Sequence, residues 1–153
     1  MRQQTLVVFL LPLRLFAGWV FLMEALGKLT SGWVQNGKLA VLAGGWLHEG
    51  RPYGFYTPFL RDVVLTHAHG FSVLVVAGEL CVGTALLAGL FSRWAAAGGL
   101  VLALNFMLAR GDGIGPNPTA PFVAICFTLL LSSAGRALGL DAALRGKVPG
   151  WLC

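Results

Sequence analysis

Long apolar stretches alternate with short polar segments along the chain, a pattern that predicts membrane-spanning helices. We expect four such helices, at 6–29, 71–91, 93–110 and 120–138. Each is close to the ~20 residues that an α-helix needs to cross the hydrocarbon core of a bilayer. A short turn around Ser92 and Arg93 joins the second helix to the third and makes them an antiparallel hairpin. The predicted fold class is an all-α, four-helix membrane bundle, with residues 1–153 forming one domain.

The segment between the first two spans, residues 30–70, has a different character. It is amphipathic and punctuated by Gly and Pro, and no part of it is long and apolar enough to span a membrane. We expect short helices at the membrane interface, with aromatic rings at headgroup level. These rings belong to Trp33, Trp46, Tyr53, Phe55, Tyr56 and Phe59.

Composition agrees with an integral membrane protein. Hydrophobic residues make up 57% of the chain and charged residues 11%, whereas about 25% are charged in soluble domains. The net charge of +5 comes mostly from basic residues at span ends and in loops, where anionic lipid explains them. Membrane lipid, rather than nucleic acid, is therefore the expected partner.

The distribution of Lys and Arg also predicts an orientation. A small excess of these residues lies on the side that holds both termini, which predicts that the termini are cytoplasmic. In a bacterial source the membrane would be the cytoplasmic (inner) membrane, and the aromatic segment 30–70 would face the periplasm.

Charged residues inside the apolar spans are the main functional signal. They are Arg14, Glu24 and Lys28 in the first span and Glu79 in the second. A charge at the centre of a bilayer costs roughly 2.5–3.5 kcal/mol on insertion scales, so such residues usually face a polar interior. At a rise of about 1.5 Å per residue, Arg14, Glu79 and Asn105 fall at similar depths, roughly 12–18 Å from the terminal side. We therefore expect an Arg14–Glu79 ion pair with Asn105 beside it.

Two interpretations of this polar core remain open from the residues alone. In the first, Arg14 and Glu79 act in a pocket for a polar headgroup such as a quinone, or in a proton path. In the second, they form a buried ion-pair network that fixes helix register. Glu24 and Lys28 are four residues apart in the order that favours an ion pair, and we interpret that pair mainly as scaffold near the interface.

Other residues with useful chemistry are few. His67 and His69 would point about 200° apart on a helix and would not chelate one metal ion. An interfacial or capping role is favoured for them, and proton transfer to a quinone remains open. The three cysteines, at 81, 126 and 153, form no CxxC pair. Neither a disulfide framework nor a metal site is therefore predicted.

Three parts of the chain carry motifs of a known family. The first span reads LRLFAGWVFLMEALGKL at 13–29. The central hairpin has Gly-Glu-Leu at 78–80 and Gly-Leu-x-x-Arg at 89–93, and the C-terminal region has Gly-Arg-x-x-x-Leu-Asp at 135–141. Together they resemble the DoxX/DoxD family of small four-helix membrane proteins over nearly the whole chain. The long first connection resembles the DoxD-like branch.

The resemblance implies a function and a set of residues. DoxD-like proteins are membrane subunits of a thiosulfate:quinone oxidoreductase, and DoxX relatives are linked to membrane oxidoreductase complexes in thiol stress defence. A quinone is thus the implied cofactor, and a second protein subunit the implied partner. By match to the family, Arg14, Lys28, Glu79 and Arg93 carry its signature. The chain shows no redox cysteine pair and no flavin, haem or iron–sulfur motif, so whether it is itself an enzyme stays open.

Two functional hypotheses follow. The first is a quinone-interacting membrane subunit of an oxidoreductase complex, linked to thiosulfate or thiol oxidation. Its candidate catalytic residues are Glu79 and Arg14, and its candidate headgroup-binding residues are Lys28, Asn105, Arg110 and His67. The second is a non-catalytic accessory subunit that packs against a larger membrane complex, in which the charges are scaffold. A transporter is disfavoured because one four-helix unit shows no internal repeat.

Overall fold

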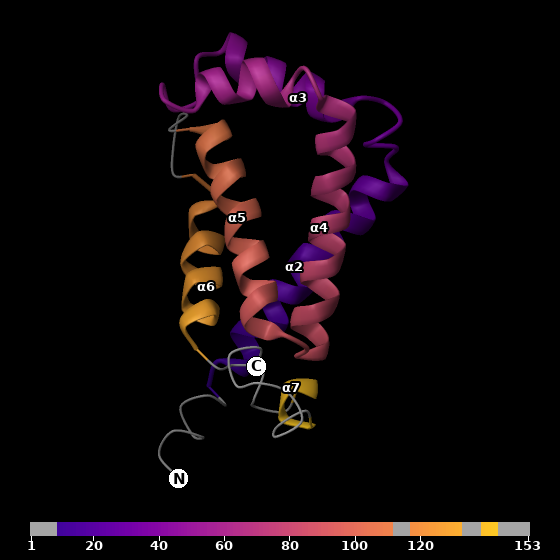
Figure 1. Ribbon diagram of the computed structural model, residues 1–153, viewed down its shortest axis with the longest axis vertical. Coiled ribbons are helices and arrows are strands. Elements are labelled where there is room, and N and C mark those ends of the chain that lie inside the picture. The colour runs from indigo at the N-terminus through magenta and orange to yellow at the C-terminus, as the bar shows by residue number, and fades with distance from the viewer. Residues whose placement is uncertain (1–8, 112–116, 133–138, 144–153) are drawn as a thin grey trace.

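The computed structural model describes residues 9–111, 117–132 and 139–143, and in these three segments all regular secondary structure is helical (Figure 1). The all-α fold class predicted from the sequence is therefore confirmed for this part of the chain. The helices are α2 (Leu11–Thr30), α3 (Lys38–His48), the π-helix η1 (Phe59–Val64), α4 (Ala68–Ala88), α5 (Ser92–Arg110), α6 (Ala120–Leu131) and α7 (Leu140–Ala143).

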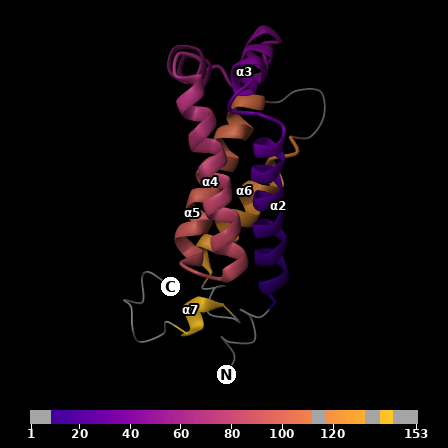
Figure 2. The same cartoon turned by 90° about the vertical axis from the view of Figure 1, so that its right-hand side faces the viewer.

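Four helices form the long body of the molecule. Helix α2 packs against α4, α4 against α5, and α5 against α6, and the four run along the long axis in Figures 1 and 2. Helix α3 lies across one end of this bundle, whereas the short α7 lies near the opposite end. The bundle core is built largely from small and aliphatic side chains, namely Ala17, Phe21, Val82, Leu86, Ala95, Ala96, Cys126 and Leu129.

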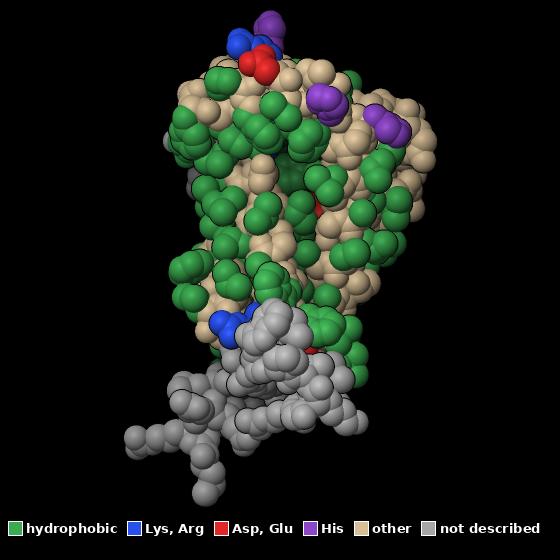
Figure 3. All heavy atoms as spheres, in the orientation of Figure 1, with side chains coloured by type: hydrophobic (Ala, Val, Ile, Leu, Met, Phe, Trp, Pro, Cys, Tyr) green, Lys and Arg blue, Asp and Glu red, His purple; other side chains and the backbone are tan. Residues whose placement is uncertain are grey.

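The helices differ in how well they suit a membrane. Among those described, α4 and α5 are long and apolar enough to cross one. Helix α2 has 20 residues but carries three charged side chains, and α6 is apolar but has only 12 residues. The rest of the predicted fourth span, 133–138, lies outside the described residues, so the count of four spans stays a prediction. The body in Figure 3 is largely apolar between its two ends, as a lipid-facing surface should be.

Two glycines bring α2 and α4 into close contact. A Cβ added to Gly83 would lie 2.6 Å from the backbone nitrogen of Leu22, and one added to Gly18 would lie 3.0 Å from that of Leu87. Small residues of this kind allow close approach of helix backbones in membranes. The contact fixes the antiparallel register of α2 and α4, and this register decides where the charged residues of α2 fall.

The turn between α4 and α5 is held by a residue from far along the chain. Gly89 ends α4 with φ of +65°, a left-handed conformation that favours glycine. The fully buried Asp141 of α7 accepts hydrogen bonds from the backbone N–H groups of Phe91, at 2.7 Å, and Ser92, at 3.0 Å. It thereby caps α5, where the helix dipole favours a negative charge. The turn predicted around Ser92 and Arg93 thus lies slightly earlier in the chain.

The segment between α2 and α4 forms a cap over one end of the bundle. Leu39 and Ala43 of α3 pack against Leu60 and Val64 of η1 and against Ala109 of α5, in a second small core. The prediction of short helices in this segment is confirmed. Their packing on α5 and α4 encloses the space beneath them, and the candidate site lies there.

Candidate functional site

A buried lysine joins two carboxylates where α2 faces α4. The Nζ atom of Lys28 lies 2.9 Å from Glu24 Oε2 and 2.9 Å from Glu79 Oε1. The side chains of Lys28 and Glu79 are 11% and 5% exposed, whereas that of Glu24 is 62% exposed. The predicted Glu24–Lys28 pair is thus confirmed, and it belongs to a triad that runs from a buried carboxylate to one at the surface.

Aromatic rings lie against the ammonium of this triad. Lys28 Nζ lies 5.6 Å from the ring centroid of Trp33 and 5.8 Å from that of Phe106, within the range in which a ring face attracts a cation. Trp33 is positioned by the turn that ends α2, where its backbone N–H donates to the carbonyl oxygen of Lys28 at 3.0 Å. The ammonium is therefore held by charge and by aromatic faces together.

These groups line a cavity of about 450 Å³, here called the polar cavity. Helices α2, α3, α4 and α5 contribute to it, and the start of α6 closes one edge. Its volume is within the ~300–1,000 Å³ typical of small-ligand sites. Its charged, polar and aromatic lining residues are Phe21, Glu24, Lys28, Trp33, Trp46, Glu79, Phe106, Arg110, Thr119 and Phe122.

Two buried polar atoms of lining residues have no hydrogen-bond partner among the described residues, Glu79 Oε2 and Trp33 Nε1. The carboxylate oxygen accepts hydrogen bonds, and the indole N–H donates one. Leaving such an atom unsatisfied costs about 1–3 kcal/mol. Lys28 has three N–H donors, of which the two described bonds use two. The cavity therefore suits a bound molecule that both donates and accepts hydrogen bonds.

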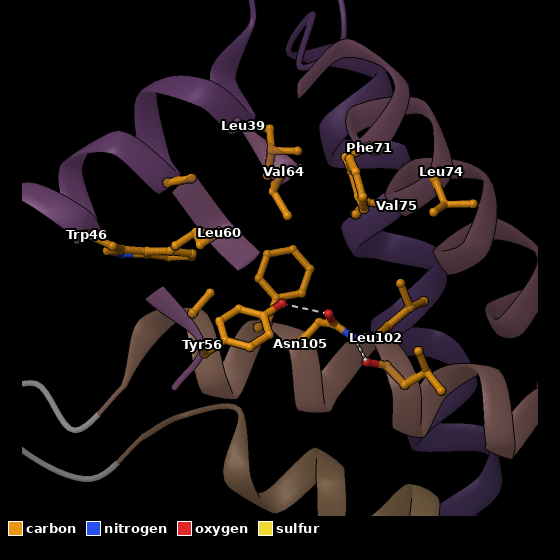
Figure 4. A pocket seen from close by; sticks show the side chains of 14 residues that line it. Leu39, Trp46, Tyr56, Leu60, Val64, Phe71, Leu74, Val75, Leu102 and Asn105 are labelled. Carbon is orange, nitrogen blue, oxygen red and sulfur yellow. Dashed lines mark hydrogen bonds between the residues drawn. The ribbon is translucent and has the colours of Figure 1, made fainter. Parts of the chain in front are cut away.

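A second cavity of about 270 Å³, here called the apolar cavity, adjoins the first. Its walls come from α3, η1, α4 and α5 (Figure 4), and none of the described residues that line it is charged. Three side chains, Trp46, Leu102 and Phe106, line both cavities. The two spaces therefore share a wall made of side chains.

The apolar cavity contains one polar pair. The hydroxyl of Tyr56 donates to Asn105 Oδ1 at 2.6 Å (Figure 4), and Asn105 Nδ2 donates to the carbonyl oxygen of Val101 at 2.7 Å. Burial raises the pKa of Tyr56, so the hydroxyl keeps the proton that it donates. In contrast to Glu79, the side chains of Tyr56 and Asn105 both find hydrogen-bond partners within the chain.

The structure brings together only part of the predicted site. Glu79, Lys28 and Arg110 all line the polar cavity. Asn105 lines the apolar cavity instead of lying beside Glu79. His67 is exposed at the start of α4 and lines neither cavity.

The predicted Arg14–Glu79 ion pair is wrong. Glu79 pairs with Lys28, and the buried Arg14 lies at the other end of α2, where a Cβ added to Gly89 would come within 2.8 Å of its Nη1 atom. Gly89 follows Glu79 by about 15 Å along the helix axis, at ~1.5 Å per residue. The prediction counted depth from the span ends, whereas the glycine contact between α2 and α4 sets the register.

Three contributors to the two cavities were not predicted as site residues. Trp33 and Tyr56 were expected as membrane anchors, and Phe106 was not considered. Trp33 had a usable signal, because it follows Lys28 within about one and a half helical turns. Tyr56 had none, because its partner Asn105 is 49 residues away in sequence.

These features define a helical membrane protein with a charged cavity enclosed among its helices. A family model, DoxX, matches residues 9–110, which is more than half of the chain. The chain therefore belongs to the DoxX family. The match spans α2 to α5 and includes the Glu24–Lys28–Glu79 triad. No solved structure matches the chain.

Proposed function

We propose that the chain is a quinone-interacting membrane subunit of an oxidoreductase complex, and that the polar cavity is its headgroup site. The observation that carries the proposal concerns two buried atoms on residues that line one cavity. Glu79 Oε2 and Trp33 Nε1 have no hydrogen-bond partner in the described part of the chain. Membership of the DoxX family supports the membrane setting.

The hydrogen-bonding groups of the cavity match those of a quinone and its quinol. A quinone carbonyl oxygen accepts hydrogen bonds, which the Trp33 N–H and the remaining N–H of Lys28 can donate. A quinol hydroxyl donates one, which Glu79 Oε2 can accept. The rings of Trp33 and Phe106 offer apolar faces beside the ammonium. A flat ring with polar oxygens therefore fits this site better than a purely apolar or a purely ionic ligand.

The triad also gives a route for protons. When bound, a quinone supplies a two-electron, two-proton redox couple. Glu79 exchanges a proton with a headgroup oxygen, and Lys28 holds the carboxylates of Glu79 and Glu24 on either side of one ammonium. Glu24 is 62% exposed, so it exchanges protons with water. The groups form an unbroken hydrogen-bonded series from the cavity to the surface.

We assign the electrons to a second subunit. The sequence has no redox cysteine pair and no flavin, haem or iron–sulfur motif, so a partner with its own redox group would pass two electrons to the quinone. The resemblance of the hairpin and the long first connection to the DoxD-like branch favours thiosulfate or a thiol as the reductant. In that reaction the sulfur compound is oxidised and the quinone is reduced to quinol.

A binding titration tests the headgroup site. The full chain in lipid nanodiscs is titrated with a benzoquinone and with its quinol, neither of which has a side chain, and tryptophan fluorescence quenching is measured. We expect saturable binding of both by the wild type and at least ~10-fold weaker binding of the quinol by Glu79→Gln, because the quinol hydroxyl loses its charged acceptor and a hydrogen bond to a charged group contributes about 1.5–3 kcal/mol. Glu24→Gln is the matched control. It removes the same charge from the exposed end of the triad, and its affinity should change less than ~2-fold.

The structure makes Glu79→Gln a fair test, because Lys28 keeps Glu24 as a partner and no buried charge is stranded. Equal affinities for the two glutamine variants, or no saturable quenching of the wild type, would overturn the proposal. Purification in mild detergent then addresses the complex. A stoichiometric quinone with a redox partner supports the proposal, whereas a large complex without quinone supports the accessory-subunit hypothesis.

A further inference from the structure

The apolar cavity has an opening on the side of the bundle, between α4 and α5. Two of its lining residues, Leu74 of α4 and Val101 of α5, are 63% and 59% exposed. Both helices are long and apolar enough to cross a membrane, so exposed apolar side chains on them face lipid. Figure 3 shows this face hollowed below the α3 cap, with acidic side-chain atoms visible inside the hollow. The hollow therefore leads from the lipid-facing surface to acidic groups in the interior.

Side chains form the boundary between the two cavities. Trp46 and Phe106 meet edge to face, with ring centroids 6.5 Å apart and an interplanar angle of 88°, and Leu102 completes the shared wall. Side chains change rotamer on a much faster timescale than backbones rearrange. A ligand that occupies both cavities therefore requires movement of a few side chains and no change in helix packing.

The chemistry of the two cavities is complementary. The polar cavity holds the Lys28 ammonium and the unpartnered oxygen of Glu79. The apolar cavity has no charged residue among its described lining residues, and its Tyr56–Asn105 pair is already hydrogen-bonded. One space therefore suits a polar ring, and the other suits hydrocarbon.

We propose that the apolar cavity holds the hydrocarbon tail of the molecule whose headgroup occupies the polar cavity, and that this molecule enters sideways from the bilayer between α4 and α5. The inference rests on the proposed function for the identity of the headgroup. It assigns the first part of the tail to the cavity of about 270 Å³, and the remainder of a long tail passes through the opening into lipid. The site thus selects lipid-soluble quinones with a hydrocarbon tail over water-soluble quinones that have the same ring without a tail.

Two ligands and two matched variants test the tail assignment. The ligands share one quinone ring, with and without a decyl side chain. Val75→Phe fills the apolar cavity, which Val75 lines. Val73→Phe is the control, because Val73 is on the same helix, is 46% exposed and lines neither cavity. Affinities are measured in nanodiscs, and each is divided by the wild-type value for the same ligand, so partition of the ligand into lipid cancels.

We expect Val75→Phe to weaken binding of the decyl ligand at least ~10-fold, as when about two methylenes lose their burial. The ring without a tail should bind within ~2-fold of wild type, and Val73→Phe should change neither affinity. If Val75→Phe does not fold, Val101→Phe narrows the same opening from α5.

Each other result has a distinct meaning. If Val75→Phe leaves the decyl ligand unaffected while Glu79→Gln weakens binding of the quinol without a tail, the tail assignment is wrong and the headgroup site stands. If Val75→Phe weakens both ligands equally, the apolar cavity belongs to the headgroup site and the tail assignment is wrong. If Val75→Phe loses a copurifying phospholipid without any change in quinone affinity, the occupant is a lipid acyl chain. If the wild type binds neither quinone, both the proposed function and this inference fail.

Discussion

The two ends of α2 both carry a buried basic residue, but the chain satisfies the charges around them differently. At the turn end, Arg14 interacts electrostatically with Asp141, whose carboxylate accepts two backbone hydrogen bonds. At the cavity end, Lys28 holds Glu79, whose second oxygen has no partner among the described residues. A buried carboxylate in a membrane bundle therefore points to a binding site where one of its oxygens is left without a hydrogen bond. Where both oxygens accept hydrogen bonds, as in Asp141 at the turn end, it points to structure.

The largest effect is expected from removing the cation at the cavity end. Lys28→Met leaves the carboxylates of Glu79 and Glu24 without their shared partner, and a stranded buried charge costs about 3–5 kcal/mol. Reversible unfolding in mixed micelles measures this loss. The double variant Lys28→Met/Glu79→Gln should recover a large part of the stability, because it removes the stranded charge as well.

A double variant as unstable as Lys28→Met alone would contradict this account. The lost stability would then come from packing of the lysine stem against Trp33 and Phe106, and not from the ion pair with Glu79. The cavity end would in that case resemble an ordinary packed interior.

A smaller loss is expected at the turn end. Asp141→Ala removes the acceptor for the N–H groups of Phe91 and Ser92 and the electrostatic interaction of this carboxylate with Arg14. We expect a loss of about 2–3 kcal/mol in the free energy of unfolding. Asp141→Asn keeps one acceptor oxygen and should lose less. The affinity of the folded protein for the tail-less quinone should stay within ~2-fold of wild type, because the turn end contributes nothing to the polar cavity.

Quinone titration and unfolding measurements on the same samples distinguish a loss of stability from a loss of quinone affinity. A ~10-fold drop in affinity for folded Asp141→Ala would show that the two ends of α2 are coupled. The division between a structural end and a binding end would then be wrong, and Arg14 would regain the functional role that the sequence suggested for it.

Local patterns in the sequence predicted the features that depend on local spacing. The length of the apolar stretches gave the all-α class, and the four-residue spacing of Glu24 and Lys28 gave their ion pair. The presence of charge within apolar spans directed attention to Lys28 and Glu79, which the structure brings together at the polar cavity. These predictions succeeded because each depends on residues within one helix.

The features that failed depend on how separate helices meet. The partner of Glu79 follows from the register of α2 on α4, which is fixed by the contact between Gly18 and Gly83. Nothing in the length of either span encodes that contact. The bond between Tyr56 and Asn105 likewise depends on the cap folding back on α5. The sequence therefore predicted which types of residue form the candidate site, but it did not predict which of these residues contact one another.

The smallest effect is expected at the hydrogen-bonded pair of Tyr56 and Asn105 in the apolar cavity. Tyr56→Phe removes the hydroxyl that donates to Asn105 at 2.6 Å, and we expect a loss of about 1 kcal/mol near neutral pH. Affinity for the tail-less quinone should not change, because this hydroxyl is already used within the chain. A clear loss of affinity would extend the headgroup site into the apolar cavity and blur the distinction between filled and unfilled groups.

The pH dependence of the stability difference between wild type and Tyr56→Phe tests whether the buried hydroxyl is its cause. Burial raises the pKa of Tyr56 above its ordinary value of 10.0. As the pH rises past about 10, the hydroxyl ionises in the unfolded chain while the folded protein still holds the proton. The stabilisation is therefore complete below pH ~10 and is lost as the pH rises through the folded pKa. The stability advantage of wild type over Tyr56→Phe should shrink above pH ~10 in unfolding measurements. An advantage that stays constant there would mean that the hydroxyl is exposed to water rather than buried against α5.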